Sequence, residues 1–304
     1  MLQSPTQSQD QRGHAIAYRL AGATGFAVMA ALIKVSVAAG TSVVEVMFWR
    51  FAFGLVPLFL YISTRSSFGV VRTRHFGAHA WRAAIGLASM YLAFRALALL
   101  PLAEATTISF AAPLFAIALS ALALRESVGP RRWSAVAVSF AGVLVVADPG
   151  GETLPAAGLL FAVGAAIGVA AVTIAIRRIG RTEAPETTVF WFTALSLIVL
   201  AVPTIHAATP HDTRGWLLLL GIGLAGGAAQ IFMTASLARA RVSIVAPFDY
   251  SQLVWAVLLG WLIWGTVPTA RTWTGAAIIA ACGIYSAYRE RILQRLADLA
   301  ATRT

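Results

Sequence analysis

The sequence predicts an all-α integral membrane protein in which ten transmembrane helices form two inverted five-helix repeats, with both termini in the cytoplasm. Three observations predict this fold. The 304-residue chain is 59% hydrophobic and only 12% charged, whereas a soluble domain is roughly half apolar and a quarter charged. Its apolar residues form long blocks with basic residues in alternate connections, and short patterns recur in the second half of the chain.

The apolar blocks give the predicted spans. A helical block of about 20 residues crosses a hydrocarbon core of roughly 30 Å. The polar start, MLQSPTQSQDQR, contains no short apolar core followed by a cleavage site, so we expect the first block to remain in the membrane. The predicted spans are residues 16–38, 42–63, 80–99, 102–124, 133–147, 156–176, 187–207, 214–236, 243–264 and 272–288.

The distribution of basic residues gives the direction of the spans. With the N-terminus in the cytoplasm, 18 of the 23 lysine and arginine residues fall in cytoplasmic segments, and we count Arg19 and Arg82 among them. Only Arg214 and Arg271 fall on the opposite side. This asymmetry follows the positive-inside rule and places both termini in the cytoplasm. Because the net charge of +11 is confined to alternate connections, it indicates a membrane orientation and not nucleic-acid binding.

The chain repeats itself after five spans. The pattern VMFWRFA at 46–52 matches TVFWFTA at 188–194, and a second alignment with an offset of 140 residues places Trp133 on Trp273. Because five is odd, the second copy must enter the membrane from the opposite side. We therefore predict a first repeat at 1–150 and an inverted second repeat at 151–304, which ends in a cytoplasmic tail.

Inverted repeats suit alternating access, because an exchange of shapes between the two halves moves the opening from one face to the other. This favours a secondary transporter over a receptor, an enzyme or a scaffold. The sequence contains no nucleophile and base constellation, no phosphate-binding loop and no clustered metal ligands. GIGLAGG at 221–227 lies inside a predicted span and not after a strand, so we predict no cofactor. We read Gly223 and Gly227 as a close helix contact.

The run LALLPLAEATTISFAAPLFAIALSALALRESVGP, within 97–146, resembles the fourth and fifth helices of the drug/metabolite transporter superfamily, EamA type. A weaker echo covers 235–284, in which Thr266 takes the place of Glu126. The resemblance covers all ten spans and implies a multi-pass transporter of the bacterial inner membrane. Within the superfamily the chain looks similar to amino-acid exporters, including aromatic amino-acid exporters of the YddG type. APFDY also resembles importers of S-adenosylmethionine or riboflavin.

The segment PFDYSQ places the carboxylate of Asp249 inside a predicted span, where a charge costs a few kcal/mol. One reading is structural: the helix breaks after Pro247, and Asp249 accepts hydrogen bonds from freed backbone N–H groups. In the other, Asp249, Tyr250, Ser251 and Gln252 line the central path, and Asp249 holds a substrate ammonium or a coupling proton. We predict that Asp249→Asn abolishes coupled transport and leaves the amount of protein unchanged.

Lys34, Arg50 and Arg95 lie in the outer half of the first repeat, where three cations would repel unless they were paired. Glu45 and Glu104 are the nearest acids by depth, so one reading is a structural ion-pair network, with Lys34 also able to snorkel. In the other, at least one cation faces a cavity and binds a substrate carboxylate. We include Glu104 among the candidate substrate or coupling residues.

Aromatic side chains gather on spans two, three, four, seven and nine, which would meet at the centre of the bundle. They are Trp49, Tyr91, Phe94, Phe110, Trp191, Phe248, Tyr250 and Trp255. Each one could instead face lipid, but together they favour an amphipathic small-molecule substrate, and we select Tyr91 and Trp191 as candidate site residues. We predict an exporter of amino acids that works without a cofactor, with proton coupling as an open alternative. The sequence does not give an oligomeric state.

Overall fold

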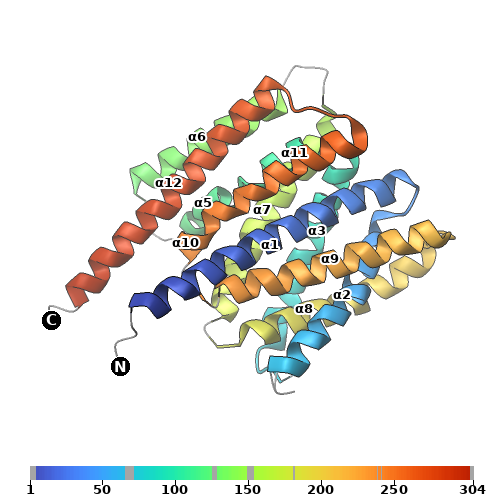
Figure 1. Ribbon diagram of the computed structural model, residues 1–304, viewed down its shortest axis with the longest axis horizontal. Helices are drawn as coiled ribbons and strands as arrows, with labels where there is room; N and C mark the ends of the chain where they lie inside the picture. The colour runs from blue at the N-terminus through green and yellow to red at the C-terminus, as the bar shows by residue number, and fades with distance from the viewer. Residues whose placement is uncertain are drawn as a thin grey trace.

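The regular structure of the described chain is entirely helical. The computed structural model describes residues 5–65, 72–124, 129–148, 154–180, 182–237, 239–240 and 242–301, and every regular element in these ranges is helical (Figure 1). The elements are α1 (Pro5–Ala38), α2 (Val43–Arg65), α3 (Phe76–Leu99), α4 (Leu102–Ser109), α5 (Ala112–Leu124), α6 (Pro130–Ala147), α7 (Ala156–Ile179), α8 (Pro185–Ala207), α9 (Thr213–Leu237), α10 (Val242–Val245), the 3-10 helix η2 (Ala246–Tyr250), α11 (Ser251–Trp264) and α12 (Ala270–Ala301).

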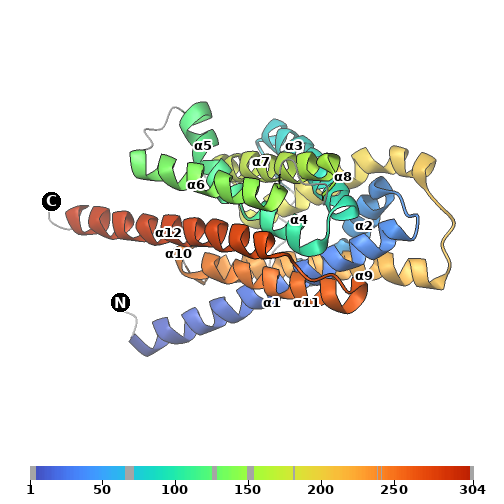
Figure 2. The same ribbon diagram turned by 90° about the horizontal axis from the view of Figure 1, so that it is seen from above.

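Seven helical segments of the described chain are long and apolar enough to cross a membrane, judged by length and composition. They lie in α1, α2, α3, α4 with α5, α7, α8 and α9, and α6 contributes a shorter apolar helix, Trp133–Ala147. The other two predicted spans, 243–264 and 272–288, are also helical chain. Both termini lie at the same end of the molecule, which we call the termini end, and the opposite end is the far end (Figures 1 and 2).

Two predicted spans are broken instead of continuous. The span 102–124 is divided between α4 and α5, and 243–264 is divided into α10, η2 and α11. Each break lies next to a proline, Pro113 or Pro247, whose ring clashes with the carbonyl group four residues earlier and which lacks an N–H donor. With the repeat offset of 140 residues, Phe110 in the first break corresponds to Tyr250 in the second. These two rings lie 4.9 Å apart between centroids.

The helices pack in pairs, and corresponding helices of the two halves take equivalent partners. α1 lies along α9, and its counterpart α7 lies along α3. α6 packs against α12 at one edge of the molecule, and α2 packs against α8 at the other (Figure 1). Each pair joins the first half to the second, as expected for interlocked inverted repeats. The predicted boundary between residues 150 and 151 lies outside the described residues.

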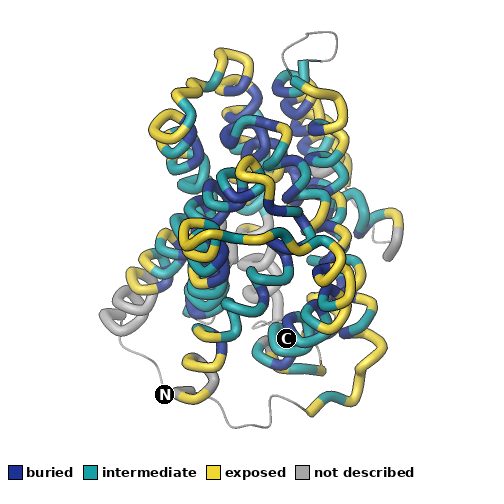
Figure 3. Tube along the Cα trace, turned by 90° about the vertical axis from the view of Figure 1, so that its right-hand side faces the viewer, coloured by how far each residue is buried: buried dark blue, intermediate teal, exposed yellow. Residues whose placement is uncertain are grey.

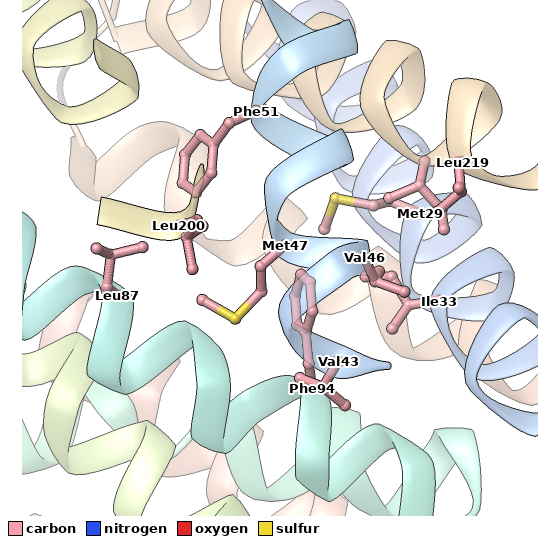
Figure 4. Close-up of a cluster of buried hydrophobic side chains, with 11 residues drawn as sticks. Met29, Ile33, Val43, Val46, Met47, Phe51, Leu87, Phe94, Leu200 and Leu219 are labelled. Atoms are coloured by element: carbon pink, nitrogen blue, oxygen red, sulfur yellow. The ribbon is translucent and has the colours of Figure 1, made fainter. Parts of the chain in front are cut away.

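A buried apolar cluster fills the space between α1, α2, α3, α8 and α9 (Figure 4). Its members come from both halves, and most of the α2 residues in it lie near the far-end start of that helix. They are Met29, Ile33, Val43, Val46, Met47, Phe51, Leu87, Phe94, Leu200, Leu219 and Ile222. The outside of the helix bundle carries most of the exposed positions (Figure 3). Many of these are large apolar side chains such as Leu160 and Ile205, which suits a surface in contact with lipid.

Glycines bring three helix pairs into close contact, one of them through the predicted Gly223 and Gly227. A Cβ atom at Gly227 would lie 2.4 Å from Pro57 of α2, and one at Gly25 would lie 2.9 Å from Ala229 of α9. A Cβ atom at Gly168 of α7 would lie 2.7 Å from Ser89 of α3. The glycine contact on α9 is therefore confirmed, and it belongs to the interface with α2.

Candidate functional site

Asp249 forms a bidentate ion pair with Arg19 near the termini end. Both carboxylate oxygens of Asp249 in η2 accept hydrogen bonds from the guanidinium group of Arg19 in α1. The Arg19 side chain is 6% exposed and that of Asp249 is 38% exposed. The prediction of a broken helix is confirmed, but the carboxylate binds Arg19 and not the freed backbone. Arg19, counted among the cytoplasmic residues, lies inside α1, where the pairing compensates its buried charge.

The neighbours of Asp249 hold the break in place. The Tyr250 ring packs against Phe110, and its hydroxyl group lies against the backbone of α12 at Gly283. The hydroxyl group of Ser251 donates a 2.7 Å hydrogen bond to the carbonyl oxygen of Phe248. Gln252 is partly buried in the first turn of α11. Tyr250 and Ser251 therefore stabilise the unusual backbone, and a role for either of them in a substrate path stays a prediction.

The contact between Tyr250 and Gly283 gives a direct test of this packing. A Cβ atom at Gly283 would lie 1.8 Å from the Tyr250 hydroxyl oxygen. We expect Gly283→Ala to lower the free energy of unfolding by about 1–3 kcal/mol, the usual cost of overpacking. Because Tyr250→Phe removes the clashing oxygen, the double variant should recover most of the melting temperature in detergent. A double variant as unstable as Gly283→Ala alone would contradict this packing.

Lys34 and Glu104 lie near the far end, where they join different helices. The ammonium group of Lys34 donates hydrogen bonds to the carbonyl oxygens of Leu97 (3.0 Å) and Leu100 (2.7 Å). It therefore caps the C-terminal end of α3, where carbonyl groups lack helical partners. The first carboxylate oxygen of Glu104 accepts a 2.9 Å hydrogen bond from Thr272, and the second is buried without a partner in the described structure.

A cavity of about 500 Å³ lies beside Glu104. Its lining includes Asp148, Thr266 and Thr272, and Asp148 is ion-paired with Arg271 there. The second predicted acid, Glu45 of α2, is not part of this lining. Its carboxylate lies 2.7 Å from the His211 ring nitrogen and accepts hydrogen bonds from the backbone and hydroxyl groups of Thr209. This contact fixes the start of α2 to the connection between α8 and α9.

The predicted network of ion pairs is not found among the described residues, where Lys34 forms no ion pair with Glu45 or Glu104. Among the described residues, neither Glu45 nor Glu104 forms an ion pair with Arg50 or Arg95. Arg95 lies over the Phe161 ring at 5.5 Å, and its Nε atom is buried without a hydrogen-bond partner. Of the predicted aromatic residues, Tyr91 is 39% exposed and lines neither cavity described here. Trp191 packs against Phe76, with its indole nitrogen unpaired in the described chain.

A second cavity, of about 60 Å³, lies between α2, α3, α8 and α9 and contains two arginines. Arg50 and Arg82 line it, together with Phe192, Thr193 and Gln230. Arg82, counted among the cytoplasmic residues, is only 8% exposed and lies within α3. The helix begins at Phe76, four residues before the predicted start of the span, and this places Arg82 in its second turn.

Glu183 joins two connections at the termini end, outside the membrane-spanning segments. Its carboxylate accepts hydrogen bonds from the Thr73 hydroxyl group (2.8 Å) and the Arg74 backbone N–H (3.2 Å). The hydroxyl group of Thr73, aided by the Arg74 amide, holds the pKa of the Glu183 carboxyl below its usual value. This contact fixes the entry to α3 next to the entry to α8. Within the described residues, no three or more potential metal ligands lie together.

Comparison with known proteins gives the family. The model of the EamA-like transporter family matches residues 13–147 and 156–288, one copy in each half. A riboflavin transporter of Vibrio cholerae is 34% identical over 234 residues, which cover 76% of this chain and 78% of the relative. A pseudopaline exporter of Pseudomonas aeruginosa is 29% identical over 84% of this chain and 90% of its own length.

A further relative, an S-adenosylmethionine uptake transporter of Rickettsia conorii, is 27% identical over 81% of this chain and 83% of its own. A crystal structure with 20% sequence identity superposes with a TM-score of 0.62 over 90% of this chain and 98% of that one, which shows a shared fold. The names of these relatives include two substrates predicted as alternatives, riboflavin and S-adenosylmethionine, and do not include aromatic amino acids. The superfamily prediction is confirmed: this is a multi-pass transporter of the inner membrane, and the chain belongs to the EamA-like transporter family.

Proposed function

We propose that the protein is a secondary transporter that exports amino acids or metabolites derived from them, by alternating access of its two five-helix repeats. The observation that carries the proposal is the pair of broken helices at the same position in both halves, which meet at Phe110 and Tyr250. Interrupted helices at the interface of two repeats commonly form transporter substrate sites. The concentration of basic residues in alternate connections supports a cytoplasmic location for both termini.

Different contacts join the halves at the two ends. At the termini end, α1 is tied to η2 through Arg19 and Asp249. At the far end, Glu45 binds the connection before α9, and the apolar cluster fills the adjoining space. Alternating access requires that one set of contacts opens while the other stays closed. We propose that a proton taken up by Asp249 weakens its pairing with Arg19 and so couples transport to the proton gradient.

A second candidate function is the uptake of riboflavin. It is favoured by the riboflavin transporter that is 34% identical to this chain over most of both lengths. Riboflavin is larger than an amino acid and carries no carboxylate. The first candidate therefore needs a cation, such as a buried arginine, to bind the substrate carboxylate, and the second candidate does not.

Counterflow into liposomes tests the proposal. Purified protein is reconstituted in vesicles preloaded with one unlabelled compound, and entry of labelled phenylalanine, threonine, methionine, lysine, S-adenosylmethionine or riboflavin is followed with and without a pH gradient. We expect saturable counterflow of at least one amino acid or of S-adenosylmethionine. Counterflow of riboflavin alone would favour the second candidate. No counterflow with protein that elutes as a single folded species would contradict transport of all these compounds.

A further inference from the structure

Two arginines from neighbouring helices converge on one small cavity without an acid between them. Arg50 of α2 and Arg82 of α3 both line the cavity of about 60 Å³. The Nε atom of Arg50 and the Nε and Nη1 atoms of Arg82 are buried and have no hydrogen-bond partner in the described structure. The two guanidinium groups are close enough to repel each other. Burying unpaired like charges is unfavourable unless an anion binds them.

The acids that the structure describes are occupied elsewhere or lie away from this cavity. Glu45 binds His211, Asp249 binds Arg19, Asp148 binds Arg271 and Glu104 accepts a hydrogen bond from Thr272. No acidic residue contributes to the described lining of the cavity. An anion that neutralises the two arginines must therefore come from outside these groups.

The cavity is built to hold the guanidinium groups in fixed planes. Arg82 lies 3.7 Å from the centre of the Phe192 ring, and Arg50 lies 4.9 Å from that of Phe51. Stacking on an aromatic ring fixes the plane of a guanidinium group and leaves its N–H edge free for an oxyanion. Gly226 leaves room for this arrangement, because a Cβ atom there would lie 2.6 Å from the Met29 sulfur and 3.5 Å from the Arg50 Nε atom.

The dimensions and lining of the cavity point to a head group and not to a complete metabolite. A space of about 60 Å³ holds a carboxylate but is too small for an amino acid with an aromatic side chain. Thr193 and Gln230 supply further polar groups in the wall. The remainder of a substrate needs space between helices that are free to separate. α3 packs less extensively against α2 and α8 than α2 packs against α9, so a movement of α3 is the one that opens this space most readily.

We infer that Arg50 and Arg82 together bind the carboxylate group of the transported substrate, between α2, α3, α8 and α9. The inference rests on the proposed function for its connection to transport, but the binding site itself does not depend on it. Two planar guanidinium groups suit the flat, two-oxygen carboxylate, which each can bind through two parallel hydrogen bonds. The site thereby selects substrates with a carboxylate over neutral compounds such as riboflavin.

Stabilisation by a small carboxylate tests the site without requiring transport. The melting temperature of the full-length protein in detergent is measured while sodium propionate replaces sodium chloride at constant ionic strength. We expect a saturable rise in the wild type. In Arg50→Gln and Arg82→Gln the apparent Kd should increase by about tenfold or more, since each variant loses charge-assisted hydrogen bonds. Arg214→Gln is the control, because Arg214 is an exposed cation of α9 that does not line the cavity.

Further variants and anions keep the test decisive. If Arg82→Gln does not fold, Arg82→Lys retains the positive charge without the planar fork and should still bind propionate more weakly than the wild type. An unchanged propionate response in folded Arg50 and Arg82 variants, or no response in the wild type, would overturn the inference. Inorganic phosphate that stabilises the wild type more than propionate does would overturn the assignment to a carboxylate.

The same variants separate this inference from the proposed function. Propionate binding that depends on Arg50 and Arg82, without counterflow of any tested compound, would support the anion site and contradict the proposed transport. Counterflow of an amino acid that is unaffected in both variants would support transport and overturn the anion site. We expect instead that counterflow of the amino acid falls by at least about tenfold in both variants and persists in Arg214→Gln.

Discussion

Asp249→Asn is expected to abolish transport and also to lower the stability of the protein. Arg19, whose side chain is 6% exposed, has Asp249 as its ion-pair partner in the described structure. A neutral asparagine leaves this buried charge uncompensated, which costs about 3–5 kcal/mol for a fully buried pair. Because Asp249 is 38% exposed, we expect a loss nearer 2 kcal/mol. This changes the sequence-based expectation that the amount of protein stays constant.

A double variant separates the charge balance from the proposed role in transport. Arg19→Gln with Asp249→Asn removes both charges, so the melting temperature should return most of the way to that of the wild type. Counterflow should remain absent, because the group proposed to carry the coupling proton is missing. Wild-type counterflow in the double variant would show that the pair serves only the fold.

The control for stability is Arg271→Gln. It breaks another ion pair of the same chain, but the Arg271 side chain is 62% exposed. Exposed pairs contribute about 1 kcal/mol or less, so we expect little change in the melting temperature. A loss as large as that of Asp249→Asn would contradict the importance of burial for the Arg19 pair.

The sequence was sufficient for the features that depend on local pattern. Apolar length predicted the helical spans, and spacing predicted the close contact through Gly223 and Gly227. The five-span repeat was visible because paired positions such as Trp133 and Trp273 keep a constant offset. Proline at 247 also indicated that a helix would break near Asp249. Each of these predictions uses neighbours in the chain or a simple period, and none of them requires knowledge of how the helices pack.

The partners of the buried charges could not be predicted in this way. The number of residues from the end of a span gives the depth of a side chain but not the helix that it faces. Asp249 pairs with Arg19, which is 230 residues away in the sequence, and Lys34 donates hydrogen bonds to the end of α3. Arg82 was missed because α3 begins at Phe76 without a side-chain capping hydrogen bond from His75, so the sequence carries no clear start signal.

Gly223→Ala and Gly227→Ala are expected to disrupt the packing of α9 against α2. A Cβ atom at Gly223 would lie 2.4 Å from the Phe53 Cβ atom, and one at Gly227 would lie 2.4 Å from the Pro57 ring and 3.1 Å from the Gly54 carbonyl oxygen. These neighbours belong to the backbone or to its nearest atoms, so relief requires the helices to move apart. We expect the free energy of unfolding of each variant to fall by about 1–3 kcal/mol, which is measured as a lower melting temperature in detergent.

Gly221→Ala is the matched control on the same helix. Its added Cβ atom would meet only the end of the Leu32 side chain, at 3.1 Å, and that side chain can rotate away. Gly221→Ala should therefore keep wild-type stability and counterflow, whereas Gly223→Ala and Gly227→Ala should be less stable and show less counterflow.

Because α2 carries Arg50 and α9 carries Gln230, separating these helices also widens the cavity between them. Propionate binding should then weaken in Gly227→Ala even where the protein remains folded, and unchanged binding would show that the α2–α9 contact does not shape the anion site.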